Sequence, residues 1–344
     1  MGCGMLLIQQ LIDRRTGGEE IMSPILDVND LYLSFSTEEG ELEAINGLDL
    51  EVEQGKIHGL IGETGCGKSV TGRTILGLFD SNTMIKGGEI LYNGEDLLSK
   101  TQHELQRDYR GNEIAMIFQD PGSSLNPVFK IEDQLDEVLR IYQPGNKAER
   151  KKKMIEALNS VKLPDPERLL KKYPHQLSGG MKQRVMIALN LACQPSLLIA
   201  DEPTTALDVS IQAQFINVLK ELQKEIDITI LYITHDMAVV SEICDQVSVM
   251  YAGKIVENVP MEDLFNNPVH PYSKLLVSSV LGPDTSIDNL VEISGSVPRL
   301  INPPPGCRFH PRCEHAKPEC KEEPPILKEV APGHQVACYK EDLS

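Results

Sequence analysis

The stretch GETGCGKS at residues 62–69 decides the fold class, because it fits the pattern G-x-x-x-x-G-K-[ST]. The apolar run before it predicts a strand, and the sequence from Lys68 onward predicts a helix. Glycines let backbone N–H groups surround phosphate oxygens, and a helix N-terminus adds a positive dipole end. Lys68 supplies a charge for the β- and γ-phosphates, and the Ser69 hydroxyl is suited to Mg²⁺. A chance glycine turn is the alternative, and the strand–turn–helix context disfavours it.

A second stretch, LLIADEP at residues 197–203, predicts a buried strand that carries two carboxylates to the same site. Asp201 stands at the strand end, where its carboxylate can hold Mg²⁺ through water. Glu202 can polarise an attacking water as a general base. The alternative is a surface turn before Pro203, which fits poorly with an apolar strand aimed at both acids.

Three further polar residues each follow a predicted strand or its turn, namely Gln119, Asp208 and His235. Taken singly, each is more often structural, and His235 alone would be interpreted as a hydrogen-bonded histidine. As a set they are expected to converge at the carboxyl ends of parallel strands, where α/β sheets place their ligands.

Strands alternating with helices predict an α/β fold with a parallel sheet, interrupted by a helical insert at about residues 120–195. From about residue 259 the chain becomes proline-rich, and we expect an irregular appendage there. Residues 1–22 are interpreted as a disordered leader, a weak imitation of a signal peptide with too short an apolar run.

The composition narrows the function classes. A chain of 344 residues can bury a sizeable core, and its 51 acidic against 33 basic side chains give a net charge of −18. This balance argues against a nucleic-acid partner, which requires clustered Lys and Arg. No apolar run approaches the roughly 18 residues of a membrane-spanning helix. We therefore expect a cytoplasmic protein with reduced thiols.

The stretch LSGGMKQR at residues 177–184 decides the class, because it creates a second glycine-rich helix start that could bind an anion. One nucleotide cannot easily satisfy two such sites in different lobes. With these motifs the sequence resembles the ATP-binding subunits of ABC transporters over about residues 25–340. By this resemblance, residues 62–69 correspond to the family's Walker A motif, residues 177–181 to its signature and residues 197–202 to Walker B. Gln119 corresponds to the Q-loop, Asp208 to the D-loop and His235 to the switch histidine.

The resemblance implies a RecA-like P-loop NTPase core with an antiparallel β subdomain at 23–118 and 196–258. It also implies a helical subdomain at 119–195 and a cysteine-rich C-terminal extension at 259–344. A head-to-tail dimer is implied as well, in which Ser178, Gly179 and Gly180 close on the γ-phosphate held by the partner's Walker A. Hydrolysis then removes the bridging charge and loosens the dimer.

Site roles follow from the same resemblance. Catalysis is assigned to Glu202, His235, Lys68 and Gln119, and Mg²⁺ to Ser69, Gln119 and Asp201. Phe35 is the candidate for stacking on adenine, although the loop after it is longer than the common pattern. The ATP-binding set comprises Phe35, Gly62, Glu63, Thr64, Gly65, Cys66, Gly67, Lys68, Ser69, Val70, Gln119, Ser178, Gly179, Gly180 and Asp208.

Four longer blocks look like the ATPases of dipeptide and oligopeptide importers, at residues 118–134, 173–193, 200–214 and 267–279. That branch implies a peripheral subunit at the cytoplasmic face of the cell membrane, with two membrane permease subunits and, indirectly, an external peptide-binding protein. Because the branch also includes nickel and glycan importers, the blocks leave the substrate open.

The sequence disfavours two other classes of protein. A soluble ABC ATPase of translation or DNA repair would carry a second nucleotide domain, a long coiled coil or a zinc insertion, and none is apparent. A regulatory subunit with a dead site would have lost Lys68, Asp201 or Glu202, and all three are present.

Half of the eight cysteines lie near the carboxyl end, in the spacing C-x5-C-x6-C-x17-C formed by Cys307, Cys313, Cys320 and Cys338. The spacing matches neither common zinc pairs nor the C-x2-C-x2-C run of ferredoxins, so it does not name a metal. An irregular loop with little apolar content nevertheless needs a cross-link, which a bound metal supplies. His310, His315 and His334 are spare ligand candidates, and Arg308 and Arg312 could offset the thiolate charge.

The importer resemblance implies that the four cysteines hold a [4Fe–4S] cluster, with zinc as the alternative. We expect the cluster to serve as a structural staple, because no electron-transfer partner is visible in the sequence.

Overall fold

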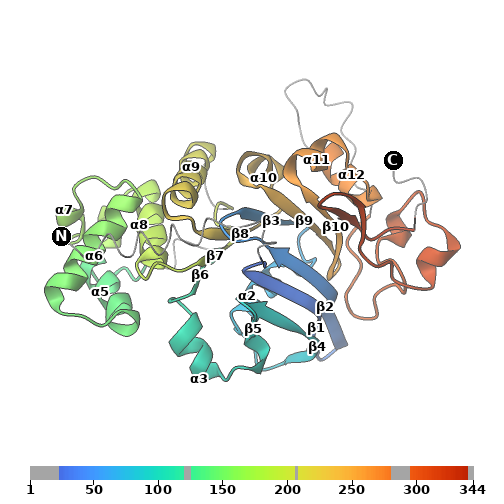
Figure 1. Cartoon of the computed structure of the whole chain (residues 1–344), viewed down its shortest axis with the longest axis horizontal. Coiled ribbons are helices and arrows are strands. Elements are labelled where there is room, and N and C mark those ends of the chain that lie inside the picture. The colour runs from blue at the N-terminus through green and yellow to red at the C-terminus, as the bar shows by residue number, and fades with distance from the viewer. Residues whose placement is uncertain (1–22, 120–124, 206–207, 280–294, 340–344) are drawn as a thin grey trace, which may run out of the picture.

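The computed structural model describes residues 23–119, 125–205, 208–279 and 295–339. The predicted leader, residues 1–22, lies outside this part of the chain. In Figure 1 a central sheet separates a group of helices on one side from the C-terminal extension on the other, and a smaller sheet lies beneath it.

The central sheet is mainly parallel, as the alternating pattern predicted. Its strand order is β11-β12-β10-β9-β3-β8-β7-β6. The parallel strands are β3 (Ile57–Ile61), β6 (Ile114–Ile117), β7 (Leu197–Asp201), β8 (Thr229–Thr234) and β9 (Gln246–Tyr251). Almost every residue in them is buried, because helices or the second sheet cover both faces.

The second sheet is antiparallel and has the order β2-β1-β4-β5. Its strands are β1 (Leu26–Thr37), β2 (Gly40–Val52), β4 (Thr83–Tyr92) and β5 (Glu95–Asp96). A short helix, α3 (Gln102–Glu104), follows it. Helix α2 (Lys68–Ile75) lies between the two sheets, since Ile75 shares one core with Leu33 of β1 and Ile199 of β7. The phosphate loop is therefore held between two layers.

Two helices that follow β7 and β8 cover the opposite face of the central sheet. They are α9 (Val209–Ile226) and α10 (Met237–Ile243). Phe215, Leu219 and Leu222 of α9 are buried, and their helical spacing places them on the one face of α9 that packs on the core.

The helical insert contains α5 (Ile131–Tyr142), α6 (Lys147–Ser160), α7 (Pro166–Leu169) and α8 (Gly179–Leu191). Its core includes Leu135, Leu158 and Val185, one from each of the three longer helices. Asn146 caps α6 by accepting hydrogen bonds from the N–H groups of Ala148 and Glu149, each 3.0 Å long. Figure 1 shows this group of helices projecting from the β6–β7 side of the sheet.

The extension is more regular than the sequence predicted. It contains α11 (Met261–Asn266), α12 (Pro271–Ser278) and a hairpin of β11 (Lys328–Ala331) and β12 (His334–Val336). The hairpin joins the central sheet, since β12 pairs with β10 (Lys254–Pro260). The proline content obscured this pairing, because both strands are too short for a clear alternation of side chains.

A buried carboxylate fixes the extension to the core. Glu257 of β10 is fully buried and accepts hydrogen bonds of 2.9 Å from the N–H groups of Val269 and His270. His334 Nε2, from the hairpin, lies 2.7 Å from the same carboxylate. Removing any one partner would leave a buried polar group unpaired. This would lower the stability of the fold more than the loss of a surface contact would.

Among the described residues, no helix is both long enough and apolar enough to cross a membrane.

Candidate functional site

The phosphate loop connects β3 to α2 through backbone conformations that require glycine. Gly62 has φ +153°, and a Cβ there would lie 2.1 Å from the carbonyl oxygen of Met250. Gly67 has φ +110°, with the carbonyl oxygen of Ala44 2.7 Å from a Cβ position. Both glycines therefore allow a close approach that no other residue would permit.

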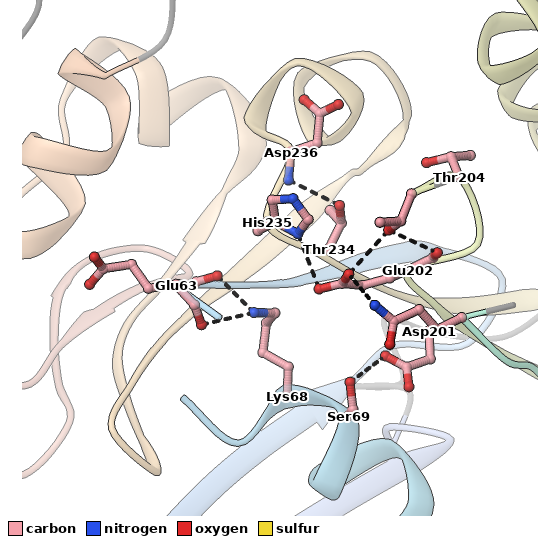
Figure 2. Close-up of polar contacts among 12 residues, drawn as sticks. Glu63, Lys68, Ser69, Asp201, Glu202, Thr204, Thr234, His235 and Asp236 are labelled. Carbon is pink, nitrogen blue, oxygen red and sulfur yellow. Dashed lines mark hydrogen bonds and ion pairs between the residues drawn. The ribbon is translucent and has the colours of Figure 1, made fainter. Parts of the chain in front are cut away.

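Lys68 lies inside this loop with its side chain buried. Its Nζ donates to the carbonyl oxygens of Gly62 and Glu63, at 2.7 and 3.1 Å. The Cys66 thiol is also buried, 3.9 Å from the same ammonium. Figure 2 shows Lys68 and Ser69 side by side at the start of α2. A single positive charge is thus concentrated where a phosphate chain would lie.

Ser69 and Asp201 join the two halves of the site. Ser69 Oγ donates to Asp201 Oδ1 at 2.7 Å, although 132 positions separate the two residues. Burial raises the pKa of Asp201, and the hydrogen bond from Ser69 opposes that shift. A hydroxyl beside a carboxylate is an oxygen donor pair suited to Mg²⁺, so these residues fit the predicted ion.

Glu202 is the hub of the polar network. Its Oε1 lies 3.1 Å from His235 Nδ1, and its Oε2 accepts from Gln119 Nε2 and Thr205 Oγ1, each at 3.1 Å. The backbone of Glu202 is left-handed, with φ 44°. That conformation is unusual for a residue with a side chain, and strain of this kind is concentrated at functional sites. Gln119 after β6 and His235 after β8 thus reach the carboxylate that follows β7, and Figure 2 shows His235 directed at Glu202. Asp208, the third residue expected at this edge, does not line the site.

One cavity of about 710 Å³ connects these groups. Its lining includes the polar side chains of Lys68, Ser69, Gln119, Glu202 and His235. It also includes Phe35, Leu42 and residues 297–301 of the extension. The Glu43 N–H donates to the carbonyl oxygen of Leu300 at 2.8 Å, which attaches this segment to β2. Residues 297–301 carry no sequence motif, so only the folded structure reveals that they line this cavity.

The signature residues lie elsewhere. Ser178 caps α8 by accepting from the Met181 N–H at 3.4 Å, and it is exposed. Asp208 likewise caps α9, with the Ile211 N–H at 2.9 Å. Among the described residues that line the cavity, none belongs to residues 177–181 or 208. A single chain therefore does not bring its signature to its own phosphate loop.

Comparison with known proteins decides the family. The model of the ABC transporter family matches residues 45–205, and that of the oligopeptide/dipeptide transporter C-terminal region matches residues 256–320. A probable peptide ABC transporter ATP-binding protein of Sinorhizobium fredii is 47% identical over 92% of this chain and 95% of its own length. The oligopeptide transport ATP-binding protein OppD of Escherichia coli is 46% identical over 92% of this chain and 93% of its own length.

The chain belongs to the ATP-binding subunits of peptide ABC transporters. A dimeric structure of the bacterial ABC transporter cassette MJ0796 matches with a TM-score of 0.60 at 25% identity, covering 69% of this chain and 98% of that one. The observed fold is therefore the ABC ATPase cassette, with the central and antiparallel sheets that the resemblance implied.

In this ABC ATPase the four C-terminal cysteines line one small cavity, of about 20 Å³, together with His310 and His315. The Cys307 N–H donates to the carbonyl oxygen of Cys320 at 2.8 Å. Burial raises the pKa of the Cys307 thiol to about 11. Within the described ranges, no three His, Cys, Asp or Glu side chains are close enough together to form a ready metal site. His334, a spare ligand candidate, is paired with Glu257.

The raised pKa of Asp201 predicts the effect of Asp201→Asn on stability without nucleotide. A carboxylate with a raised folded-state pKa destabilises the fold when ionised, and this penalty disappears as the pH falls through that pKa. Asn keeps an oxygen for Ser69 and carries no charge. We expect a higher midpoint of thermal unfolding at pH 7, with the gain shrinking toward about pH 4, near the normal carboxyl value.

Asp165→Asn is the matched control, because Asp165 is an exposed cap of α7 and Asn caps equally well. Its unfolding midpoint should stay unchanged. A lower midpoint for Asp201→Asn than for the wild type at pH 7 would contradict the assignment.

Proposed function

We propose that this ABC ATPase hydrolyses ATP as a head-to-tail dimer and thereby drives uptake of dipeptides and oligopeptides through two membrane permease subunits. It would act at the cytoplasmic face of the membrane and meet an external peptide-binding protein only indirectly. The observation that carries the proposal is that Glu202 lines one cavity with Lys68 and Ser69 and is held there by Gln119 and His235, which follow two other strands of the sheet. The peptide substrate follows from the named relatives, whose identity extends over nearly the whole chain.

The network suggests how the residues divide the reaction. Lys68 and the loop N–H groups hold the β- and γ-phosphates, and Phe35 stacks on adenine. Glu202 accepts a proton from the attacking water as the new oxygen–phosphorus bond forms. The bond from the γ-phosphorus to the leaving oxygen breaks, giving ADP and phosphate. His235 and Gln119 orient the Glu202 carboxylate through their 3.1 Å contacts. Mg²⁺, held by Ser69 and Asp201 and sensed by Gln119, would neutralise phosphate charge.

The dimer proposal rests on the separation of the two helix starts within one chain. Ser178, Gly179 and Gly180 are at least partly accessible, and the nearest atom to a Cβ on Gly179 would be 3.8 Å away. Such a terminus can approach a phosphate bound to a second subunit. Asp208, the N-cap of α9, is also exposed and could likewise contact a second subunit. In this arrangement each triphosphate lies between two positive helix ends.

Glu202→Gln tests the general base. Gln keeps the shape and the hydrogen bonds but cannot accept the proton, so ATP turnover in the assembled transporter should fall about 10²- to 10⁴-fold. ATP binding should persist. Glu225→Gln, an exposed change at the end of α9, should leave turnover as in the wild type. Unchanged turnover in Glu202→Gln would remove Glu202 from the role of base.

The surface that would receive the permease subunits is an apolar groove between the core and the helical insert. It has a volume of about 710 Å³ and is lined by Leu78, Phe118, Phe129 and Tyr142 among others. The side chains of Phe129 and Phe118 are 51% and 42% exposed, which is high for large apolar side chains. Exposed apolar surface of this kind is typical of a protein-binding site.

Phe129→Asp tests this docking proposal. A charge placed in the groove should abolish co-purification with the permease subunits while nucleotide binding continues. The control is Ile226→Asp, which alters an apolar residue that is 47% exposed on α9 and away from the groove. Retention of the complex by Phe129→Asp would place the permease contact elsewhere.

We further propose that Cys307, Cys313, Cys320 and Cys338 hold a [4Fe–4S] cluster, with zinc as the alternative. The support is that all four line one cavity in the extension. Because burial disfavours the Cys307 thiolate, a cationic centre is the kind of partner that would deprotonate it. The cluster would staple the extension and takes no part in ATP hydrolysis.

The metal content tests the cluster directly. Protein purified without oxygen should be brown and contain about four irons per chain, as four-cysteine ligation of a [4Fe–4S] cluster requires. Cys320→Ser should lose the iron, whereas Cys193→Ser, a buried cysteine of the helical insert, should retain it. Colourless protein containing zinc would exclude the cluster.

A further inference from the structure

The loop between the first two cysteines of the extension, residues 307–313, is attached to the nucleotide core through its side chains. We call it the cysteine loop. Arg308 is 5% exposed, and it donates to the carbonyl oxygen of Ala252 and forms an ion pair with Glu43 of β2. Arg308 and Arg312 were candidates to offset the charge of the four thiolates, but in the structure each forms an ion pair with a carboxylate of the core.

Arg312 reaches the phosphate loop itself. Its Nη1 and Nη2 donate to the two carboxylate oxygens of Glu63, at 2.7 and 3.2 Å. The Arg312 side chain is 7% exposed and that of Glu63 is 26% exposed. Nη1 also lies 3.2 Å from the hydroxyl of Tyr251. A shielded, bidentate pair of this kind fixes both partners in orientation more strongly than a surface ion pair does.

Glu63 connects this ion pair to the phosphate-binding lysine. Its carbonyl oxygen accepts from Lys68 Nζ at 3.1 Å and from the Cys66 N–H at 3.3 Å. Its own N–H donates to the Tyr272 hydroxyl at 2.9 Å. Figure 2 shows the Glu63 carboxylate directed away from the site while its backbone faces Lys68. One residue is thus held by the cysteine loop on one side and holds the lysine on the other.

An aromatic cluster stiffens this connection. Phe309 of the cysteine loop packs against Tyr251 and Tyr272, with ring centroids 5.1 and 5.4 Å apart, and is 1% exposed. Both tyrosines also bind the network through their hydroxyls. A displacement of the cysteine loop would therefore move the partners of Glu63 together, because a close-packed interior transmits strain.

We propose that Arg312 is a positioning residue for ATP binding, through which the state of the four-cysteine module sets the affinity of the phosphate loop. The proposal rests on the ATP-binding function proposed above and adds its regulation. Coupling of this type is reciprocal, so nucleotide binding should also stabilise the folded cysteine module. A purely structural staple would instead change the stability of the extension without changing the affinity of the loop.

The test measures the dissociation constant of the full-length protein for a non-hydrolysable ATP analogue with an imido bridge. Arg312→Ala should weaken binding about 5- to 150-fold, the usual range of coupling between sites. Arg312→Lys keeps the charge and loses the bidentate geometry, so its dissociation constant should lie between those of the wild type and Arg312→Ala. Arg107→Ala is the control, since this arginine is 63% exposed and paired with its neighbour Asp108.

A double-mutant cycle separates positioning from general damage. Glu63→Ala should weaken binding, and adding Arg312→Ala should cause little further loss, because both changes remove the same contact. Cys313→Ala as a single change should also weaken binding of the analogue. The same change made in the Arg312→Ala protein should have a smaller effect. Unfolding midpoints without nucleotide, measured for every variant, identify any that fail to fold, and Glu63→Gln then replaces Glu63→Ala.

Additive losses across the cycle, or wild-type affinity in a folded Arg312→Ala protein, would overturn the positioning role. Failure of the wild type to bind the analogue would instead reject the proposed ATP function, so the two failures remain distinguishable.

Discussion

The hydrogen bond from Ser69 to Asp201 joins the two halves of the site, and the rest of the arrangement depends on it. Ser69 lies in the first turn of the helix between the two sheets, and Asp201 ends a strand of the central sheet. Because Asp201 is buried, this bond also provides a polar partner that the carboxylate would otherwise lack. The layered fold can therefore be understood as the framework that brings this pair to one edge.

Around that pair, parallel strands deliver the remaining chemistry to a single place. Gln119 follows β6, Glu202 follows β7 and His235 follows β8, and these three strands are neighbours in the sheet. The order of the strands in the sheet thus brings together three residues that lie far apart in the sequence. Glu202 occupies the centre, in a strained backbone conformation that its neighbours hold in place.

Much of this could be predicted from the sequence. The loop at residues 62–69 and the acids at 201 and 202 carry their chemistry in short, contiguous patterns, and the buried strands have a clear apolar run. Other parts could not be predicted, because they depend on contacts between distant segments. Residues 297–301 have no motif, and their place in the cavity follows from one short pairing with β2. The same holds for Arg312, whose partner Glu63 lies 249 positions away. Short strands such as β11 and β12 are equally hard to predict, since proline and charged residues surround them.

The carboxylate of Glu257 has a practical consequence for how this extension can be studied. It accepts hydrogen bonds from the start of α12 and from His334, so its partners come from both ends of the C-terminal segment. Cutting the chain before the hairpin would strip one partner from a buried charge and uncover the edge of β10, a surface prone to pairing with other chains. A shortened protein would therefore lose stability and solubility together, whereas single side-chain replacements keep these two effects apart.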